Sequence, residues 1–316
     1  MWPATSYLRA LHYPGPASFP VRTVEWIRDN GGGDVVDFVE SLWFASPPTA
    51  ATPDATSVPA DLAASAAPVD PSVLPPPIPI AGGLVPLAAE GQWVAGRSGP
   101  GGRPTFCTTF ERPDPRHPSM VVGVARIDTR TTRVQLVAGT TQPDRSAQPD
   151  QAQVPASARG ALAATFNSGF KIADARGGYL RNGHAVGMLR PGAASVVVYA
   201  AGAATVGQWG RDVALGTNVV AVRQNLDLVV DGGRPVPGLM DGTGRRWGSP
   251  ENRAQYTWRS GLGVDSQGDL VYVGGANLNL AALADALVQA GVTRGMQLDM
   301  HHAMVDFLSY PNGATD

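Results

Sequence analysis

Residues 279–299 read NLAALADALVQAGVTRGMQLD and place an amphipathic helix directly before a strand. From Leu280 onward, apolar residues recur at i, i+3, i+4, i+7 and i+8, which is the spacing of one buried helix face. Asn279 suits the N-cap position, and Gly291 suits the C′ position at which a helix ends. The strand that follows ends at Asp299. We therefore expect the Asp299 carboxylate at the exposed carboxyl end of a strand, a common place for catalytic groups.

The residues before this unit predict a β-rich domain. In the stretch VDSQGDL, residues 264–270, polar turn residues with a glycine separate two apolar runs, which is typical of a hairpin connection. Other short apolar runs are separated by glycine in the same way. Together with the helix, they predict an α+β domain over residues 88–316, with a central mixed β-sheet and packed helices. The expected strands are 120–127, 133–137, 162–166, 195–199, 226–230, 261–264, 270–273 and 296–298.

The N-terminal part of the chain has a different pattern. Residues 19–27 and 35–44 carry apolar side chains at helical spacing on either side of Gly31-Gly32-Gly33. They predict two short helices that are too short to be stable alone and therefore pack on the main domain or on a partner. Ten prolines follow between Ala45 and Pro79, which predicts a semi-rigid linker. The expected organisation is a helical segment (1–44), a Pro/Ala-rich linker (45–80) and one catalytic domain (88–316).

The composition excludes several classes of protein. The chain has 316 residues and a formal net charge of −2, so the usual electrostatic case for nucleic-acid binding is missing. One cysteine, Cys107, excludes an internal disulfide framework and a Cys-rich zinc site. Residues 1–80 carry a net charge of −5 and the remainder +3, so the body is mildly basic. There is a single lysine, Lys171, against 23 arginines, which codon usage explains best.

The common nucleotide, hydrolase and protease motifs are missing. The sequence has no phosphate loop, no dinucleotide Gly-x-Gly-x-x-Gly after a strand, no Gly-x-Ser-x-Gly elbow and no His-Glu-x-x-His pair. No apolar run reaches the roughly 18 residues that cross a bilayer. We expect no cofactor. The start of the sequence lacks a signal peptide, yet a proline-rich linker is common in exported proteins, so we expect an extracytoplasmic protein with a leader or membrane anchor upstream.

Three segments in order resemble motifs of the phosphodiester glycosidase family. Residues 166–170, FNSGF, resemble the family's Asn-Gly-Gly-Phe-Phe segment at a strand end. Residues 258–265, WRSGLGVD, resemble its Arg-Thr-Ala-Ile-Gly segment with the hairpin that follows. The helix and strand that lead to Asp299 resemble the approach to its Leu-Asp-Gly-Gly-Gly-Ser segment. The three matches span residues 160–310, and the resemblance implies a hydrolase that cleaves the bond between a sugar C1 and a phosphodiester oxygen.

The resemblance also implies roles for individual residues. Asp299 is expected to act as nucleophile or as the base that activates water, with Asp265 as a second catalytic carboxylate. Arg259 offers a bidentate fork to phosphate oxygens. Asn167 is expected to bind a sugar hydroxyl or acetamido group, and Gly169 belongs to the same turn. Lys171, four residues after Asn167, is expected to be a second phosphate contact.

The chain departs from the family after Asp299. Where the family has glycines, this chain has Met300-His301-His302-Ala303-Met304, which fills the space that glycines leave for a ligand. His301 is expected to be a general acid or base, because its ordinary pKa lies near neutrality, and His302 faces the other way as a substrate contact. Two alternatives remain open. One is a catalytically altered domain that binds a glycan or a partner; the other is a metal-assisted hydrolase in which Asp299 and His301 share a metal with a third ligand such as His184 or Asp306.

Overall fold

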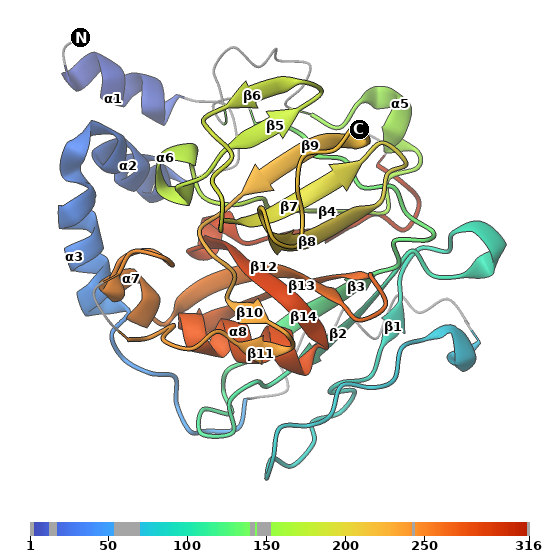
Figure 1. Ribbon diagram of the computed structural model, residues 1–316. Helices are drawn as coiled ribbons and strands as arrows, with labels where there is room; N and C mark the ends of the chain where they lie inside the picture. The colour runs from blue at the N-terminus through green and yellow to red at the C-terminus, as the bar shows by residue number, and fades with distance from the viewer. Residues whose placement is uncertain are drawn as a thin grey trace.

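The structure is a computed structural model that describes residues 3–12, 18–53, 70–139, 143, 153–241 and 244–314. The chain has the expected α+β fold, with a large sheet at its centre and helices at its margins (Figure 1). The helices are α1 (Pro3–Leu11), α2 (Phe19–Ile27), the π-helix η1 (Arg28–Gly32), α3 (Gly33–Trp43), α5 (Ala156–Arg159), α6 (Ile172–Ala175), α7 (Pro250–Ala254) and α8 (Leu280–Gln289), with the 3₁₀ turns η3 (Pro71–Val73), η4 (Pro100–Gly102) and η6 (His302–Met304).

The strands form three sheets. Eight strands make the large sheet, in the order β1 (Val94–Ala95), β2 (Phe106–Glu111), β3 (Val122–Ile127), β13 (Leu270–Leu278), β12 (Thr257–Asp265), β14 (Val292–Met300), β10 (Val230–Asp231) and β11 (Arg234–Pro235). Five more make a second sheet, in the order β6 (His184–Val186), β5 (Tyr179–Arg181), β9 (Val219–Gln224), β7 (Ala194–Tyr199) and β8 (Ala204–Gln208). β4 (Ala164–Phe166) and β15 (Phe307–Ser309) form a two-stranded ribbon.

All pairings between these strands, throughout the described chain, are antiparallel, so the expected mixed sheet is wrong in that detail. Antiparallel neighbours need only hairpins and short connections, which matches the many glycine turns between strands. The large sheet is packed on both faces. Helix α8 covers one face through Leu280, Leu283 and Leu287, and the five-stranded sheet covers the other through residues such as Val198 and Val206.

The predicted unit around α8 is confirmed. Asn279 caps the helix by accepting a 2.9 Å hydrogen bond from the Ala282 amide, and Gly291 follows the helix with φ of +87°. Strands β12, β13 and β14 are each nine residues long and extend beyond the expected runs. Of the other predictions, 120–127 and 195–199 correspond to β3 and β7, and 162–166 is shortened to β4.

Two strand predictions are wrong. Residues 133–137 form no strand, although Val134 donates a backbone hydrogen bond to Gly202. Within 226–230 only Val230 is in a strand, because Leu226 has a left-handed backbone (φ +57°) that interrupts an extended run. Strand β9, directly before it, is not among the expected strands.

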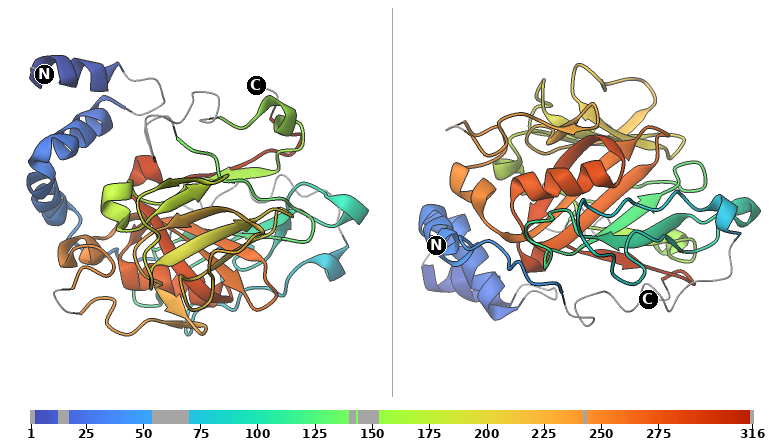
Figure 2. Two further views of the ribbon diagram at one scale, coloured as in Figure 1. Left: turned by 45° about the horizontal axis from the view of Figure 1, so that its top comes forward. Right: turned by 90° about the horizontal axis from the view of Figure 1, so that it is seen from below.

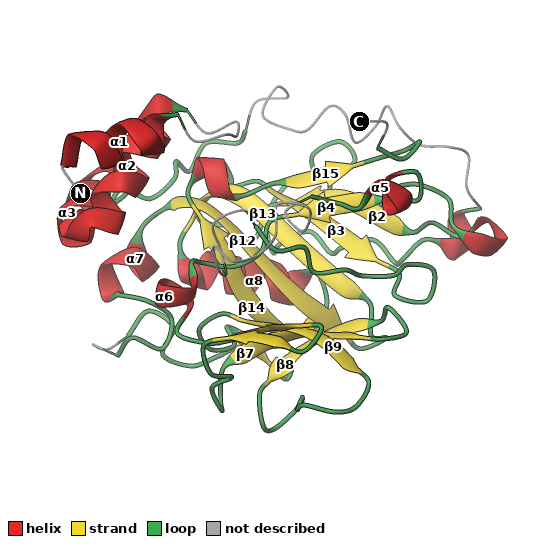
Figure 3. Ribbon diagram, turned by 90° about the horizontal axis from the view of Figure 1, so that it is seen from above, coloured by secondary structure: helices red, strands yellow, loops and turns green. Residues whose placement is uncertain are grey.

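The N-terminal helices lie along one side of the molecule, beside α6 and α7 (Figures 1 and 2). Both expected helices are present as α2 and α3, joined by η1, where Gly31 adopts φ of +90°. The backbone N–H of Tyr256, which follows α7, donates to the carbonyl of Phe44 at 2.9 Å. Figure 3 separates this group of helices from the strands of the body. Residues 19–44 are called the cover segment below.

The linker is only partly described. Residues 54–69 lie outside the described residues, and residues 70–80 run along the body. Ile78 is buried there, and the Trp93 indole N–H donates to the carbonyl of Pro76 at 2.9 Å. No helix among the described residues is long and apolar enough to span a membrane.

Candidate functional site

A bulge in strand β14 sets the direction of the Asp299 side chain. Gly261 pairs with Gln297, but two residues earlier Arg259 pairs with Met300, so β14 carries one extra residue opposite Ser260. A bulge of this kind breaks the alternation of side chains between the two faces of a sheet. Met300 contacts the Arg259 guanidinium, whereas the Asp299 N–H donates to the Ser260 hydroxyl at 3.3 Å. The bulge therefore turns Asp299 toward the face of the sheet that carries Ser260.

Asp299 is half-buried and makes no ion pair with the residues that the structure describes. Its Oδ1 accepts a 2.8 Å hydrogen bond from the Met300 backbone N–H. Burial raises the pKa of Asp299 to about 8; the Met300 hydrogen bond opposes this shift, and the nearby charge of Glu25 adds to it. The positive charge of Arg223 lowers the pKa, but not enough to compensate for burial. At neutral pH the carboxyl of this covered state is mostly protonated.

Arg223, on β9, is the cation whose charge lowers the pKa of Asp299. Its side chain is buried and donates to the backbone carbonyls of Gln224, at 2.7 Å, and Phe170. Burial lowers the pKa of Arg223 to about 10, and the charge of Asp299 partly offsets that change. The guanidinium remains positive at neutral pH. Arg223 was not among the predicted residues, although an arginine inside the apolar run of residues 219–224 was a usable signal.

Asn225, two residues later, supports the same strand end. Its Nδ2 donates to the carbonyls of Gln297 and Leu298, at 2.7 and 2.8 Å, while its Oδ1 is buried and accepts no hydrogen bond within the described chain. Gly169 lies directly above: a Cβ at that position would come within 2.8 Å of the Asn225 amide carbon. Glycine is thus needed at 169 so that the turn can approach Asn225.

Asn167 links several elements of the body. Its Oδ1 accepts from the Tyr272 hydroxyl at 2.8 Å and from the Asp306 N–H at 3.2 Å. Its Nδ2 donates to the Ser260 hydroxyl at 2.9 Å and to the Ser168 carbonyl at 3.0 Å. The amide group is therefore saturated by the protein. The structure places Asn167 beside Ser260 and Asp299 but assigns its polar atoms to positioning rather than to a sugar.

Lys171 lies between the body and the cover segment. Its Nζ contacts Glu25 at 2.5 Å and Asp29 at 2.8 Å, and its side chain is 34% exposed. Burial alone would lower the pKa of Lys171, but the hydrogen bonds to Asp29 and Glu25 outweigh it and raise the pKa. A third carboxylate of the segment, Glu40, is paired with Arg28 at 2.5 Å and lies 3.4 Å from Nε2 of His301. The segment thus covers this end of the sheet with acidic side chains.

His301 leaves the strand with an unusual backbone. Its φ of +75° and ψ of 149° lie in a region that is nearly restricted to glycine. The imidazole lies 3.4 Å from the Thr257 hydroxyl and packs beside Phe44, with 6.1 Å between ring centroids. Burial lowers the pKa of His301 to about 4, helped by the charges of Arg28 and Arg259, so the ring is neutral at neutral pH. His302 is exposed and packs edge-on against Trp258 at 5.2 Å.

Two predicted site residues do not face Asp299. The Arg259 guanidinium is fully buried and donates to the carbonyls of Leu278 (2.8 Å), Gln255 (3.2 Å) and Asn252, so none of these contacts leaves it facing a ligand. Burial lowers its pKa to about 9. Asp265 lies at the opposite end of β12 and forms a 2.7 Å ion pair with Arg126. The expected roles of Arg259 as anion holder and of Asp265 as second catalytic carboxylate do not fit these positions.

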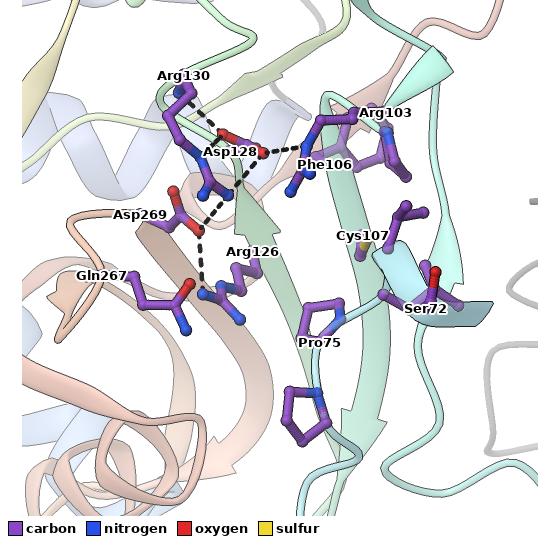
Figure 4. A pocket seen from close by; sticks show the side chains of 14 residues that line it. Ser72, Pro75, Arg103, Phe106, Cys107, Arg126, Asp128, Arg130, Gln267 and Asp269 are labelled. Carbon is purple, nitrogen blue, oxygen red and sulfur yellow. Dashed lines mark hydrogen bonds and ion pairs between the residues drawn. The ribbon is translucent and has the colours of Figure 1, made fainter. Parts of the chain in front are cut away.

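The end of the sheet near Asp265 contains a polar hollow of about 190 Å³ (Figure 4). Residues 72–76 of the linker form one wall, and strands β2 and β3 form the other. Its arginines are bound to carboxylates of the same protein: Arg126 to Asp269 at 3.0 Å, and Arg130 to Asp128 at 2.8 Å. The three arginines that line the hollow are thus each paired with a carboxylate, since Arg103 also lies 3.6 Å from Asp128.

The residues expected to share a metal are not brought together. Within the parts of the chain that the structure describes, no three His, Cys, Asp or Glu residues are arranged to hold a metal ion. Asp299 and His301 contact different partners, His184 is on β6, and Asp306 is held through its backbone by Asn167 and Tyr272. The even spacing of 299 and 301 predicts a common face only in a regular strand, and the positive φ at His301 ends that regularity.

Sequence comparisons find no matching family profile and no curated relative. Among solved structures, the chain is similar to the catalytic domain of zebrafish N-acetylglucosamine-1-phosphodiester alpha-N-acetylglucosaminidase auto-inhibited by pro-peptide, with a TM-score of 0.49 and 16% identity over 70% of this chain and 78% of that one. An uncharacterised Synechocystis protein matches with a TM-score of 0.33 and 14% identity over 60% of this chain and 55% of that one. A Burkholderia pseudomallei protein provisionally described as exported matches with a TM-score of 0.32 and 12% identity, over 61% and 70% of the two chains.

Proposed function

We propose that the protein is an exported hydrolase that cleaves the bond between the anomeric carbon of a sugar and a phosphodiester oxygen, in a sugar phosphodiester or a related cell-envelope glycan. The observation that carries the proposal is the placement of Asp299: a carboxyl without an ion pair, at a bulged strand end, beside a buried arginine. Three sequence motifs that resemble the phosphodiester glycosidase family surround this position. The proline-rich linker supports an extracytoplasmic location.

The chemistry of the bond matches the groups available. The leaving group is a phosphate monoester, a stable anion, so the reaction needs less help from a general acid than an ordinary glycoside does. The C1–O bond breaks with its electron pair on the phosphate oxygen, and water supplies a hydroxyl to C1 and one proton. What remains for the protein is to stabilise the positive charge that develops at C1 and to hold the anion.

Each named residue has a role in this scheme. Ionised Asp299 acts beside C1, either as the nucleophile or as the base that activates water. Arg223 is buried and bound to the carbonyls of Gln224 and Phe170, so it contributes positive charge from within the body and does not contact the phosphate. His301 is neutral and a weak base, since its pKa is lowered to about 4, so it is a poor proton donor and a poor proton acceptor at neutral pH in the covered state. Asn167 and Ser260 hold the strand end in place, through the bonds described above.

The protonation of Asp299 links activity to the cover segment. A neutral carboxyl is neither a nucleophile nor a base, and in the covered state burial and the charge of Glu25 both raise the pKa of Asp299. When the segment moves away, water reaches the carboxyl and the charge of Glu25 is withdrawn. Both changes lower the pKa toward the ordinary value and favour the ionised form.

The test is the release of reducing sugar from a panel of sugar 1-phosphodiesters, with wild type compared with Asp299→Asn. Turnover that disappears in this variant supports the proposal. Asp285→Asn serves as the control, because Asp285 is an exposed carboxylate on α8. Turnover that survives Asp299→Asn overturns the role of Asp299. Binding without turnover on every substrate identifies a glycan- or partner-binding domain, and turnover that a chelator abolishes and a divalent cation restores identifies a metal-assisted hydrolase.

A further inference from the structure

The cover segment meets the body through carboxylates. Glu25 and Asp29, from α2 and η1, both contact the ammonium of Lys171, and Glu40 of α3 lies beside His301. The body residues they meet follow the Asn167 turn and Asp299 in the sequence. Acidic groups of one part of the chain therefore cover the basic and catalytic groups of another.

Two carboxylates share a single ammonium at Lys171, with distances of 2.5 and 2.8 Å. An ammonium is a compact point charge that attracts anionic oxygens without a preferred fork geometry. A phosphodiester presents two oxygens that share one negative charge, so one phosphodiester can replace two carboxylate oxygens from different residues. Lys171 therefore has contacts of the kind that an anionic ligand would make.

The position of Glu25 connects Lys171 with Asp299. Glu25 contacts Lys171 directly, and its charge is near enough to Asp299 to raise the pKa of that carboxyl. Lys171 also follows the turn at Gly169, which packs against Asn225, and Asn225 Nδ2 donates at 2.8 Å to the carbonyl of Leu298, the residue before Asp299. A negative group held at Lys171 therefore lies in the same part of the molecule as Asp299. A phosphodiester bound there would bring the adjoining sugar carbon to the same neighbourhood as the catalytic carboxylate.

The α2 part of the cover segment is held only by partly exposed contacts. No residue of α2 is buried, and the ion pairs at Lys171 are partly exposed, whereas Val36 of α3 is buried and the Phe44 carbonyl accepts a hydrogen bond from Tyr256. Exposed pairs of this type are individually worth less than about 1 kcal/mol. The proline-rich linker follows the segment directly, so the segment can separate from the body while it remains attached.

We propose that Lys171 is the phosphodiester contact of the catalytic site, and that Glu25 and Asp29 occupy the place of the phosphodiester until the substrate displaces them. This inference rests on the proposed site around Asp299. The cover segment then competes with the phosphodiester group of the substrate for Lys171. It does not block a sugar that lacks a phosphate.

The experiment measures binding of two ligands to the full chain carrying Asp299→Asn, which prevents turnover. One ligand is a sugar 1-(methyl phosphate), and the other is the methyl glycoside of the same sugar, which lacks the phosphate. In Glu25→Gln/Asp29→Asn, the phosphodiester should bind about tenfold more tightly, from the loss of two partly exposed ion pairs, while glycoside binding stays the same. In Lys171→Met, the preference for the phosphodiester should disappear.

A matched control is available in the body. Arg211 contacts Asp212 and Asp231, each at 2.7 Å, so two carboxylates again share one cation. The variant Asp212→Asn/Asp231→Asn removes the same charge as the cover-segment variant and should leave both affinities unchanged. If it raises phosphodiester affinity as much, the effect is one of net charge and the proposal fails.

Two further outcomes overturn the inference. An equal gain for phosphodiester and glycoside in Glu25→Gln/Asp29→Asn would show a steric cover with no anion subsite at Lys171. A phosphodiester preference that survives Lys171→Met would place the anion elsewhere. Because these measurements concern binding, tight phosphodiester binding without turnover in the wild-type chain would reject the proposed hydrolase activity and still support the subsite.

Discussion

The two ends of the paired strands β12 and β14 carry carboxylates in opposite electrostatic settings. Near Asp265, Arg126 of β3 binds both Asp265 and Asp269 of the β12–β13 hairpin, at 2.7 and 3.0 Å. At the other end, Asp299 makes no ion pair with the residues that the structure describes, and burial dominates the behaviour of its carboxyl. Ion-paired carboxylates are common structural features. A buried carboxyl without an ion pair lowers the stability of the fold, and such groups are typical of functional sites. The difference points to the Asp299 end as the reactive one.

The largest effect should come from removing each carboxylate in turn. Asp299→Asn should reduce turnover of a sugar 1-phosphodiester by about 10³-fold, because the substitution removes the group that acts at the anomeric carbon. Asp265→Asn should leave kcat within about threefold of wild type, since Asp265 lies at the other end of the strand. Steady-state release of reducing sugar measures both. If the two variants lose the same share of turnover, the Asp299 end is not the reactive end of the sheet.

For stability we expect the opposite order: removing the cation at the Asp265 end should cost more than removing Lys171. Arg126→Met leaves Asp265 and Asp269 without their shared partner, and should lower the free energy of unfolding by about 3 kcal/mol. Lys171→Met removes contacts that are partly exposed, and should cost less than about 1 kcal/mol. Urea unfolding followed by far-ultraviolet circular dichroism gives both values. A larger loss for Lys171→Met would mean that the cover segment is an integral part of the folded body.

The pH dependence of stability should distinguish Asp299 from ordinary carboxylates. Its folded pKa of about 8 lies above the ordinary 3.8, so the native state holds a proton that the unfolded chain releases. This group therefore favours folding most below pH 4, and its contribution is lost as the pH rises toward 8. The melting temperature of the wild type should fall relative to that of Asp299→Asn between pH 5 and 8.5. A constant difference would contradict the raised pKa.

The smallest expected effect concerns the backbone after β14. His301 has φ of +75°, which a glycine adopts without strain. His301→Gly should therefore be more stable than His301→Ala by about 1 kcal/mol, since both variants lose the imidazole contacts and only glycine relieves the backbone. Thermal unfolding of the two variants is the measurement. If His301→Ala is as stable as His301→Gly or more stable, the backbone of the turn relaxes and the positive φ carries no strain.

The elements that could be predicted from the sequence are those with local signals. The α8 helix, its Asn279 cap and the strand to Asp299 follow from spacing and capping chemistry alone. The glycine break between α2 and α3 is similar, since Gly31 requires the left-handed backbone that other residues avoid. In each case the information lies within about 20 residues of chain.

The site could be predicted only in part. The candidate centre depends on contacts that no local pattern encodes. Glu25 meets Lys171 across 146 residues, and Arg223 belongs to the second sheet. The bulge at Asp299 reverses the face that strict alternation predicts. Arg259 was favoured for its residue type, but its burial against three backbone carbonyls depends on tertiary packing.

The scarcity of lysine gives the molecule a built-in chemical reporter. Lys171 is the one lysine side chain of the 316 residues, so an amine-acylating reagent has that ammonium and the terminal amine as its alkylamine targets. Only the neutral amine reacts, and the contacts with Glu25 and Asp29 raise the pKa of Lys171 and shield its nitrogen. The acylation rate at one identifiable peptide therefore follows the opening of the cover segment in the unmodified protein, with no engineered label.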